Sequence, residues 1–236
     1  MKTLSKIFLP LFGALALVAP RVAAATDGAP RSLAGYFVPA TASSKAPDQD
    51  GFLQRWLLLE PIDKPNRSNA GFVDSYVREN LTKEYFPDQF TAVPRDGDKV
   101  KVANQELAWH ALDSTGFNVK LFRFAYGLNK TVYGVIFWAV TVVDSPREMA
   151  NVRLAVGSNS ASMWWLNGEE AVDLFGDRRM VMDDCVSKRL TLRMGRNVIR
   201  GAVINGPGMS DFCARFIDDN GNAIKDLNLT LENAGK

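Results

Sequence analysis

The amino-acid sequence predicts an all-β protein, a β-sandwich that also carries one or two short helices. Two observations lead to this fold class. Apolar and polar residues alternate over many short stretches, as they do in strands with one buried face, and clusters of Gly, Asn, Asp and Pro separate these stretches at short intervals. Short strands with frequent turn residues and little helix are typical of antiparallel sandwiches.

The segment 151–166 shows this pattern most clearly. Val152, Leu154 and Val156 alternate with the residues between them, and a turn of Gly, Ser and Asn follows at 157–160. In the next strand, Trp164 shares one face with Leu166, while Trp165 lies on the other face. If Trp164 points into the sandwich, Trp165 must point out of it, toward the open face of its sheet.

An Asn-Gly pair at 167–168 follows this strand, and a partner strand returns over 169–174. Asn and Gly both tolerate the positive φ angles of a type I′ turn, so this pair is the strongest short signal for a β-hairpin. The sequence therefore predicts a hairpin around residues 167 and 168.

The remaining elements follow from strand-like alternation or from helical spacing of apolar residues. An apolar run at 129–143, in which Lys130 is the only charged residue, predicts a central strand that is covered on both faces, and helical spacing of apolar residues predicts a helix at 73–81. The other predicted strands lie at 52–59, 99–112, 119–124, 185–192, 198–204, 211–217 and 224–231. We expect the sandwich domain to occupy residues 51–232, after an irregular lead-in or linker at 26–50 and before a tail at 233–236.

The first residues predict a signal peptide. Lys2 and Lys6 precede an apolar run at 7–19 that is too short to span a membrane comfortably, and small Ala residues at 23–25 suit a signal peptidase. Residues 1–25 are therefore expected to be removed. The protein is expected to be exported to the periplasm or the extracellular space, with no transmembrane segment after cleavage.

Composition and charge narrow the classes of partner. The chain has 236 residues, of which 47% are hydrophobic, and these numbers suit one globular domain with a sizeable core. Signal cleavage removes three basic residues and no acidic one, which leaves 25 basic residues against 26 acidic ones. A nearly neutral chain without a long charge block makes nucleic acid an unexpected partner.

Two cysteines, Cys185 and Cys213, are present. An exported chain meets an oxidising compartment, where an even pair of cysteines favours a disulfide. We therefore expect a Cys185–Cys213 disulfide between neighbouring strands; the alternative is two buried free thiols. Two cysteines and a single histidine are a poor ligand set for a metal ion, and no metal or other cofactor is expected.

The order of these signals resembles the galactose-binding-like jelly-roll modules of exported bacterial proteins that break down polysaccharides. The resemblance covers about residues 52–231 and rests on these segments: Trp56–Pro61, Trp109, Leu154–Ser158, Trp165–Gly168, Leu192–Asn197, Phe212–Phe216 and Asp218–Gly221. It implies a jelly-roll topology and a carbohydrate-binding role. Some such modules are attached to acetylxylan esterases or glycoside hydrolases, which implies a hydrolase or esterase as a partner. This chain has Asn159 and Ser160 where such modules often carry two acids.

Residues for catalysis are poorly represented in the sequence. Serine hydrolysis needs a base, usually His, but the chain has one histidine, His110, and no Gly-x-Ser-x-Gly elbow. The acidic pairs at 169–170, 183–184 and 218–219 are adjacent in sequence, so in a strand their side chains point to opposite faces. No catalytic residue is assigned, although carboxylates from distant strands remain an alternative for a polysaccharide hydrolase.

The sequence therefore favours an exported, non-catalytic module that binds a polysaccharide or oligosaccharide. Aromatic rings stack on the apolar faces of sugars, and Trp165 is the predicted platform. Asn159 and Ser160 on the preceding turn, together with Arg178 and Arg179 after the returning strand, are the predicted partners of sugar hydroxyls. The alternatives are a carbohydrate esterase or glycoside hydrolase component, and a β-sandwich that binds a protein.

Overall fold

A computed structural model gives the structure of residues 31–66 and 68–231. The predicted signal peptide at 1–25 and the predicted tail at 233–236 lie outside the described residues. Strands are the dominant elements of the described residues, which confirms the all-β class. No helix in the described ranges is long and apolar enough to cross a membrane.

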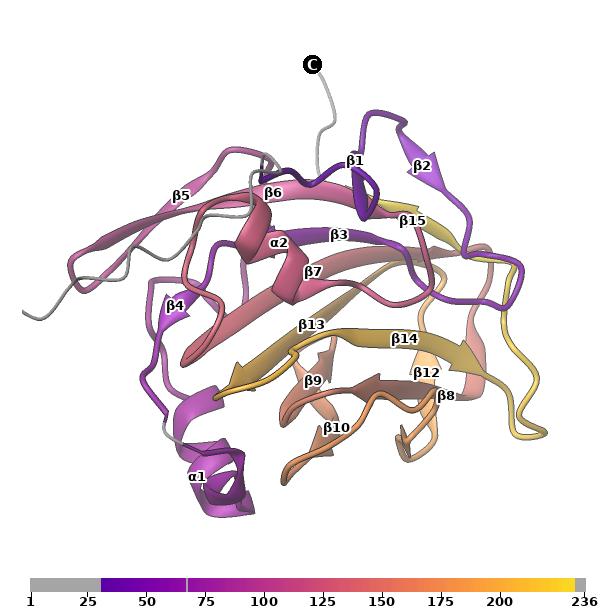
Figure 1. Cartoon of the computed structure of the whole chain (residues 1–236). Coiled ribbons are helices and arrows are strands. Elements are labelled where there is room, and N and C mark those ends of the chain that lie inside the picture. Colours follow the sequence, from indigo (N-terminus) through magenta and orange to yellow (C-terminus); the bar gives the residue numbers. More distant parts are fainter. Residues whose placement is uncertain (1–30, 67, 232–236) are drawn as a thin grey trace, which may run out of the picture. The chain divides into compact units, whose positions relative to one another are not determined.

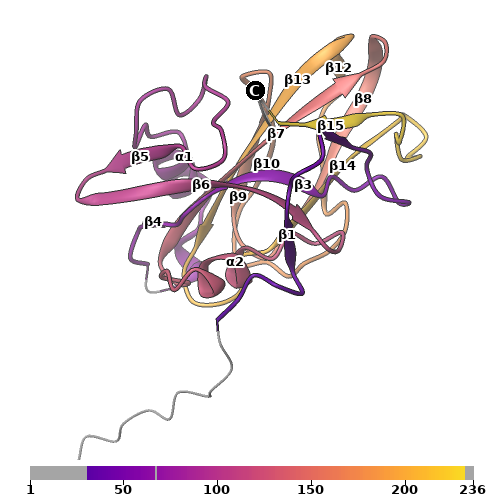
Figure 2. The same ribbon diagram turned by 90° about the horizontal axis from the view of Figure 1, so that it is seen from above.

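A large antiparallel sheet occupies the middle of the domain (Figure 1). Its central strand, β7 (Val135–Ser145), pairs along its whole length with β13 (Gly195–Asn205), and on its other side it pairs with β3 (Arg55–Leu59). The other strands of this sheet are β1 (Phe37–Pro39), β2 (Ser44–Lys45), β4 (Ile62–Asp63), β5 (Lys99–Val102), β6 (Gln105–Ser114), β9 (Ser162–Leu166), β10 (Glu169–Leu174) and β15 (Asn228–Thr230). The main order is β1-β6-β3-β7-β13-β9-β10, and the β5–β6 hairpin extends beyond the sandwich (Figures 1 and 2).

A smaller antiparallel sheet packs against one face of the large one. Its central strand is β8 (Met149–Ser158), which pairs with β14 (Phe212–Ile217) on one side and with β11 (Cys185–Val186) and β12 (Leu190–Leu192) on the other. The predicted strand over 185–192 is therefore two short strands that both pair with β8. The two sheets together make the predicted sandwich.

Two apolar layers lie on the two faces of the large sheet. The first layer fills the sandwich and includes Phe137 of β7 and Leu154 of β8. The second lies on the opposite face and includes Trp138 of β7. Because side chains alternate between the faces of a strand, β7 contributes to both layers, and this explains why its sequence has no polar face.

Two short helices cover the edges of these layers. α1 (Asp74–Leu81) lies on the second layer through Val77 and Leu81, and it confirms the helix predicted at 73–81. α2 (Leu121–Gly127) was predicted as a strand over 119–124, and that prediction is wrong. Leu121, Phe124 and Ala125 are three and four residues apart, so a helix points all of them into the first layer, whereas a strand would divide them between two faces.

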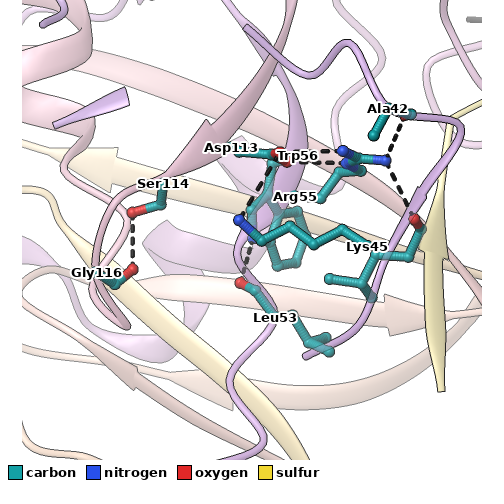
Figure 3. A network of polar contacts seen from close by, with 9 residues as sticks. Ala42, Lys45, Leu53, Arg55, Trp56, Asp113, Ser114 and Gly116 are labelled. Carbon is teal, nitrogen blue, oxygen red and sulfur yellow. Dashed lines mark hydrogen bonds and ion pairs between the residues drawn. The ribbon is translucent and has the colours of Figure 1, made fainter. Parts of the chain in front are cut away.

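A buried ion pair ties the first strands of the domain together (Figure 3). Arg55 on β3 donates from Nε and Nη2 to the two carboxylate oxygens of Asp113 on β6, at 2.8 and 3.0 Å. Its Nη1 also donates to the carbonyl oxygen of Ala42 at 2.8 Å, and Lys45 lies 3.8 Å from Asp113. Part of the predicted irregular lead-in at 26–50 thus belongs to the sheet, as β1 and β2.

The hairpin predicted at 167–168 is present between β9 and β10. Asn167 and Gly168 have φ angles of 53° and 87°, as a type I′ turn requires. Trp164 and Trp165 do point to opposite faces of the sheet, because Trp164 lies in the first layer and Trp165 lies in the second.

The predicted Cys185–Cys213 disulfide is wrong: both cysteines are free. Cys185 on β11 pairs with Val156 of β8, and Cys213 on β14 pairs with Gly157 on the opposite side of the same strand. The two cysteines are therefore two strand spacings apart, about 9–10 Å, which is too far for a disulfide. They also lie on opposite faces of the small sheet, because residues 156 and 157 are adjacent.

Candidate functional site

An open polar hollow of about 430 Å³ lies among four connecting segments of the domain. We name it the polar hollow, and its lining residues are Ser68, Asn69, Ala70, Asn159, Asp177, Arg178, Pro207, Gly208 and Met209. The segments come from the turn before α1, the β8–β9 turn, the loop after β10 and the β13–β14 loop. Residues distant in sequence therefore share this one surface.

Asn69 joins three of these segments through hydrogen bonds of its side chain. Its Oδ1 accepts from the backbone N–H of Gly206 at 3.2 Å, and its Nδ2 donates to the carbonyl oxygen of Pro207 at 3.0 Å. The same Nδ2 donates to Oδ1 of Asp177 at 2.9 Å. A Cβ at Gly206 would lie 2.5 Å from Asn69 Oδ1, so this close approach requires glycine.

Several polar groups of the hollow are free to bind a ligand. Within the described ranges, the side-chain amide of Asn159 has no hydrogen-bond partner, while its backbone N–H is fixed by the carbonyl oxygen of Asp211 at 2.9 Å. Asp177 is exposed, and only its Oδ1 is bonded to Asn69. The Ser68 hydroxyl accepts from Ala70 N–H at 3.1 Å, which leaves its proton available as a donor.

Two of the predicted sugar contacts, Asn159 and Arg178, meet in the polar hollow. The guanidinium of Arg178 is held by two contacts: its Nη1 donates to the carbonyl oxygen of Phe175 at 3.0 Å, and its Nη2 bonds Asp184. The other polar predictions fall elsewhere. Ser160 is buried, with its hydroxyl donating to the carbonyl oxygen of Ile204 at 2.5 Å, and Arg179 is exposed but outside the lining.

The prediction that Trp165 forms an exposed platform is wrong. Its exposed fraction is 7%, and its ring is stacked on Trp138. The prediction treated the second face of the sheet as open, whereas α1 and the segment that follows it cover this face. The alternation of the strand is correct, but alternation alone does not say whether the opposite face is solvent or a second core.

Sequence reasoning missed Asn69, Asp177 and Met209. The segments around them contain Asn, Asp, Gly and Pro, which are typical of loops. That signal identifies each loop by itself, but it carries no information about which loops are neighbours in space. The meeting of the four segments depends on the order of strands in the two sheets.

The single histidine lies in a separate polar cluster on β6. His110 Nε2 is 3.3 Å from Glu60 Oε1, and Lys130 lies 2.9 Å from the other oxygen of Glu60. Burial raises the pKa of the Glu60 carboxyl, but hydrogen bonds from Lys130, Ala108 and His110 outweigh burial, so the pKa lies below its usual value. The His110 ring also packs edge-on against Phe124, at 5.5 Å between centroids. Glu60 thus joins His110 and Lys130 in one polar cluster.

The fold and the hollow define the class: an antiparallel β-sandwich domain with an open polar hollow among its loops. No family model and no curated protein matches the chain. Among solved structures, the chain is similar to a PA14 sugar-binding domain from an RTX adhesin, with a TM-score of 0.41 and 11% identity over 76% of this chain and 99% of that one.

Two further structures show the same degree of similarity. For the PA14 domain of the MpAFP antifreeze protein, the TM-score is 0.40 and the identity is 9%, over 76% of this chain and 92% of that one. For a β-glucosidase from Kluyveromyces marxianus in complex with glucose, the TM-score is 0.36 and the identity 20%, over 56% of this chain and 16% of that one. These are similarities of β-rich fold and carry no functional inference.

Proposed function

We propose that this protein is an exported, non-catalytic carbohydrate-binding domain and that the polar hollow is its sugar-binding site. One observation carries the proposal. Free polar groups of Ser68, Asn159 and Asp177 converge on an open hollow whose remaining wall includes the apolar side chains of Pro207 and Met209.

This combination of groups fits the chemistry of a sugar ring. Each hydroxyl both donates and accepts hydrogen bonds, so an amide, a carboxylate and a hydroxyl together satisfy several of them. The apolar C–H surface of the ring needs contact with apolar side chains, and Met209, which is 42% exposed, offers such a surface. The hollow is open and small, so we expect weak binding to a short segment of a glycan.

The finer parts of the proposal follow from the sequence. The signal-peptide pattern at 1–25 supports export to the periplasm or the extracellular space. The resemblance to galactose-binding-like modules supports a jelly-roll topology and a role in polysaccharide breakdown beside a hydrolase or esterase. N-terminal sequencing of the exported protein tests the first point, and we expect it to begin at Thr26.

The experiment that tests the binding site compares two asparagine variants. The wild type, Asn159→Ala and Asn104→Ala are screened on a glycan array and then titrated with the glycan that gives the strongest signal. Asn159→Ala removes a free amide while keeping the backbone N–H bond to Asp211, so the fold is retained. We expect affinity to fall by roughly fivefold, the effect of about 1 kcal/mol of lost hydrogen bonding.

Asn104→Ala is the matched control, because Asn104 is exposed in the turn between β5 and β6, outside the polar hollow. It should bind the glycan as the wild type does. Binding that is equal in all three proteins would place the sugar elsewhere and remove the polar hollow from the proposal. A wild type that binds no glycan on the array would overturn the proposed function itself.

A further inference from the structure

A second hollow of about 490 Å³ lies next to the polar hollow. We name it the aromatic hollow, and its lining residues are Asp63, Pro65, Asn66, Thr131, Tyr133 and Gly134. It lies where β4 ends beside the start of β7.

Tyr133 presents an aromatic surface to this hollow. Its exposed fraction is 52%, the largest for an aromatic residue in the described part of the chain. The ring is supported from behind by Phe122, with 5.7 Å between centroids, and Phe122 in turn lies parallel to Tyr126 at 6.4 Å. The phenol ring therefore packs against Phe122 while about half of the residue stays exposed.

The aromatic hollow also contains free polar groups. Within the described residues, the carboxylate of Asp63 and the hydroxyl of Thr131 have no hydrogen-bond partner. Asn66 is different, because its amide is fully used: Nδ2 donates to the carbonyl oxygen of Lys64 at 2.5 Å and Oδ1 bonds the hydroxyl of Tyr76. An aromatic face with a nearby carboxylate and hydroxyl is again the chemistry that a sugar ring requires.

The turn at 205–208 forms a wall of the polar hollow and is also hydrogen-bonded to a residue of the aromatic hollow. On one side, Gly206 N–H donates to Asn69 of the polar hollow at 3.2 Å. On the other side, Gly206 accepts from the N–H of Gly134 in the aromatic hollow at 3.3 Å. Asn205 strengthens this wall, since its Nδ2 donates to the carbonyl oxygens of Val132 and Gly208, both at 3.1 Å. One chain segment therefore bonds to residues of both hollows.

We infer that the aromatic hollow is a second sugar subsite, so that the ligand is an oligosaccharide chain that crosses the 205–208 turn, with one ring in each hollow. This inference rests on the proposed function and names its ligand class: internal segments of a linear polysaccharide rather than a single terminal sugar. Tyr133 supplies the stacking face, and Asp63 and Thr131 bond hydroxyls of the same ring.

Length-resolved titrations test this inference. Xylo-, cello- and laminari-oligosaccharides, each from monosaccharide to hexasaccharide, are titrated into the wild type, Tyr133→Ala and Tyr133→Phe. In the wild type, affinity should rise once the oligosaccharide is long enough to fill both hollows. Tyr133→Ala should lower affinity for the longer members by about tenfold, equivalent to about 1.4 kcal/mol, while affinity for the shortest member that binds stays unchanged.

Tyr133→Phe keeps the ring and should keep the gain in affinity with length. Because Tyr133 is largely exposed, neither variant should change the thermal midpoint of unfolding, and this measurement accompanies each titration. Binding that depends on Asn159 but neither increases with length nor responds to Tyr133→Ala would overturn the second subsite and leave the proposed function in place. No binding by any of the three series would overturn the second subsite, whereas the proposed function is judged by the glycan array.

Discussion

Trp165 and Trp138 are stacked on the second face of the large sheet, with 5.7 Å between ring centroids and 15° between ring planes. Phe90 meets both rings edge-on, at 5.7 Å from Trp165 and 5.4 Å from Trp138. The three rings come from β9, β7 and the segment after α1, so they join the sheet to its cover. The face that the sequence predicted to be open is a second hydrophobic core.

Replacing Trp165 by Ala should therefore destabilise the domain. Truncation of a buried Trp in a core costs about 3–5 kcal/mol. Urea unfolding of Trp165→Ala measures it, with Phe117→Ala as control, since Phe117 is 38% exposed. An unfolding midpoint for Trp165→Ala equal to that of the wild type would contradict the second core.

Gly201 should not tolerate even one added methyl group. It lies opposite Trp164 in the ladder between β13 and β9, and a Cβ at this position would lie 2.3 Å from the indole ring. Overpacking of this kind costs about 1–3 kcal/mol. Gly116→Ala is the matched control, because nothing lies within 4 Å of its added Cβ. Equal thermal stability of the two variants would show that Trp164 can move aside.

The Arg55–Asp113 ion pair gives a prediction about buried charge. Asp113→Ala leaves the Arg55 guanidinium, whose side chain is 1% exposed, without its carboxylate. We expect a loss of about 3–5 kcal/mol in the free energy of unfolding. The double variant Arg55→Met with Asp113→Ala should recover part of this loss, because it removes the unpaired charge. If the double variant loses as much stability as Arg55→Met and Asp113→Ala lose together, the pair is not coupled.

Cys213 predicts a loss of stability at high pH. Burial raises the pKa of its thiol from the ordinary 9.0 to about 11. The unfolded chain then releases its proton at a lower pH than the folded one, so stability is full below about pH 9 and is lost as the pH rises through about 11. The free energy of unfolding should fall by about 2–3 kcal/mol across this pH range.

Chemical unfolding of the wild type and of Cys213→Ala over this pH range measures this loss of stability. All other groups are the same in both proteins, so the difference between the two pH profiles isolates Cys213. Parallel profiles would contradict the burial of the thiol. Alkylation of the exported protein, unfolded without a reducing agent, should modify both cysteines, whereas an unmodified pair with a mass lower by two hydrogens would reinstate the disulfide.

Ester hydrolysis tests the non-catalytic part of the proposed function. We expect the purified chain not to hydrolyse an activated acetyl ester, because His110 contacts Glu60 and Phe124, and neither has a hydroxyl or thiol that His110 could deprotonate. The His110→Ala variant is measured beside it. Hydrolysis that the wild type shows and the variant lacks would favour the esterase alternative.

The sequence determined the features that depend on neighbours along the chain. The turn at Asn167-Gly168 follows from φ angles that few residues adopt, α1 follows from apolar spacing, and the central position of β7 follows from a strand without a polar face. At α2, residues 119–124 fit the pattern of a strand and also that of a helix. Contact with the first layer selects the helix.

Only the tertiary structure decided what lies opposite each surface. The two faces of β9 are distinguishable from sequence, but the burial of Trp165 depends on a segment about 75 residues earlier that covers it. The separation of Cys185 from Cys213 depends on β8 lying between their strands. The polar hollow likewise needs Asn69, Asn159 and Asp177 to meet from separate loops. Local patterns carry no record of strand order, and strand order sets these long-range neighbours.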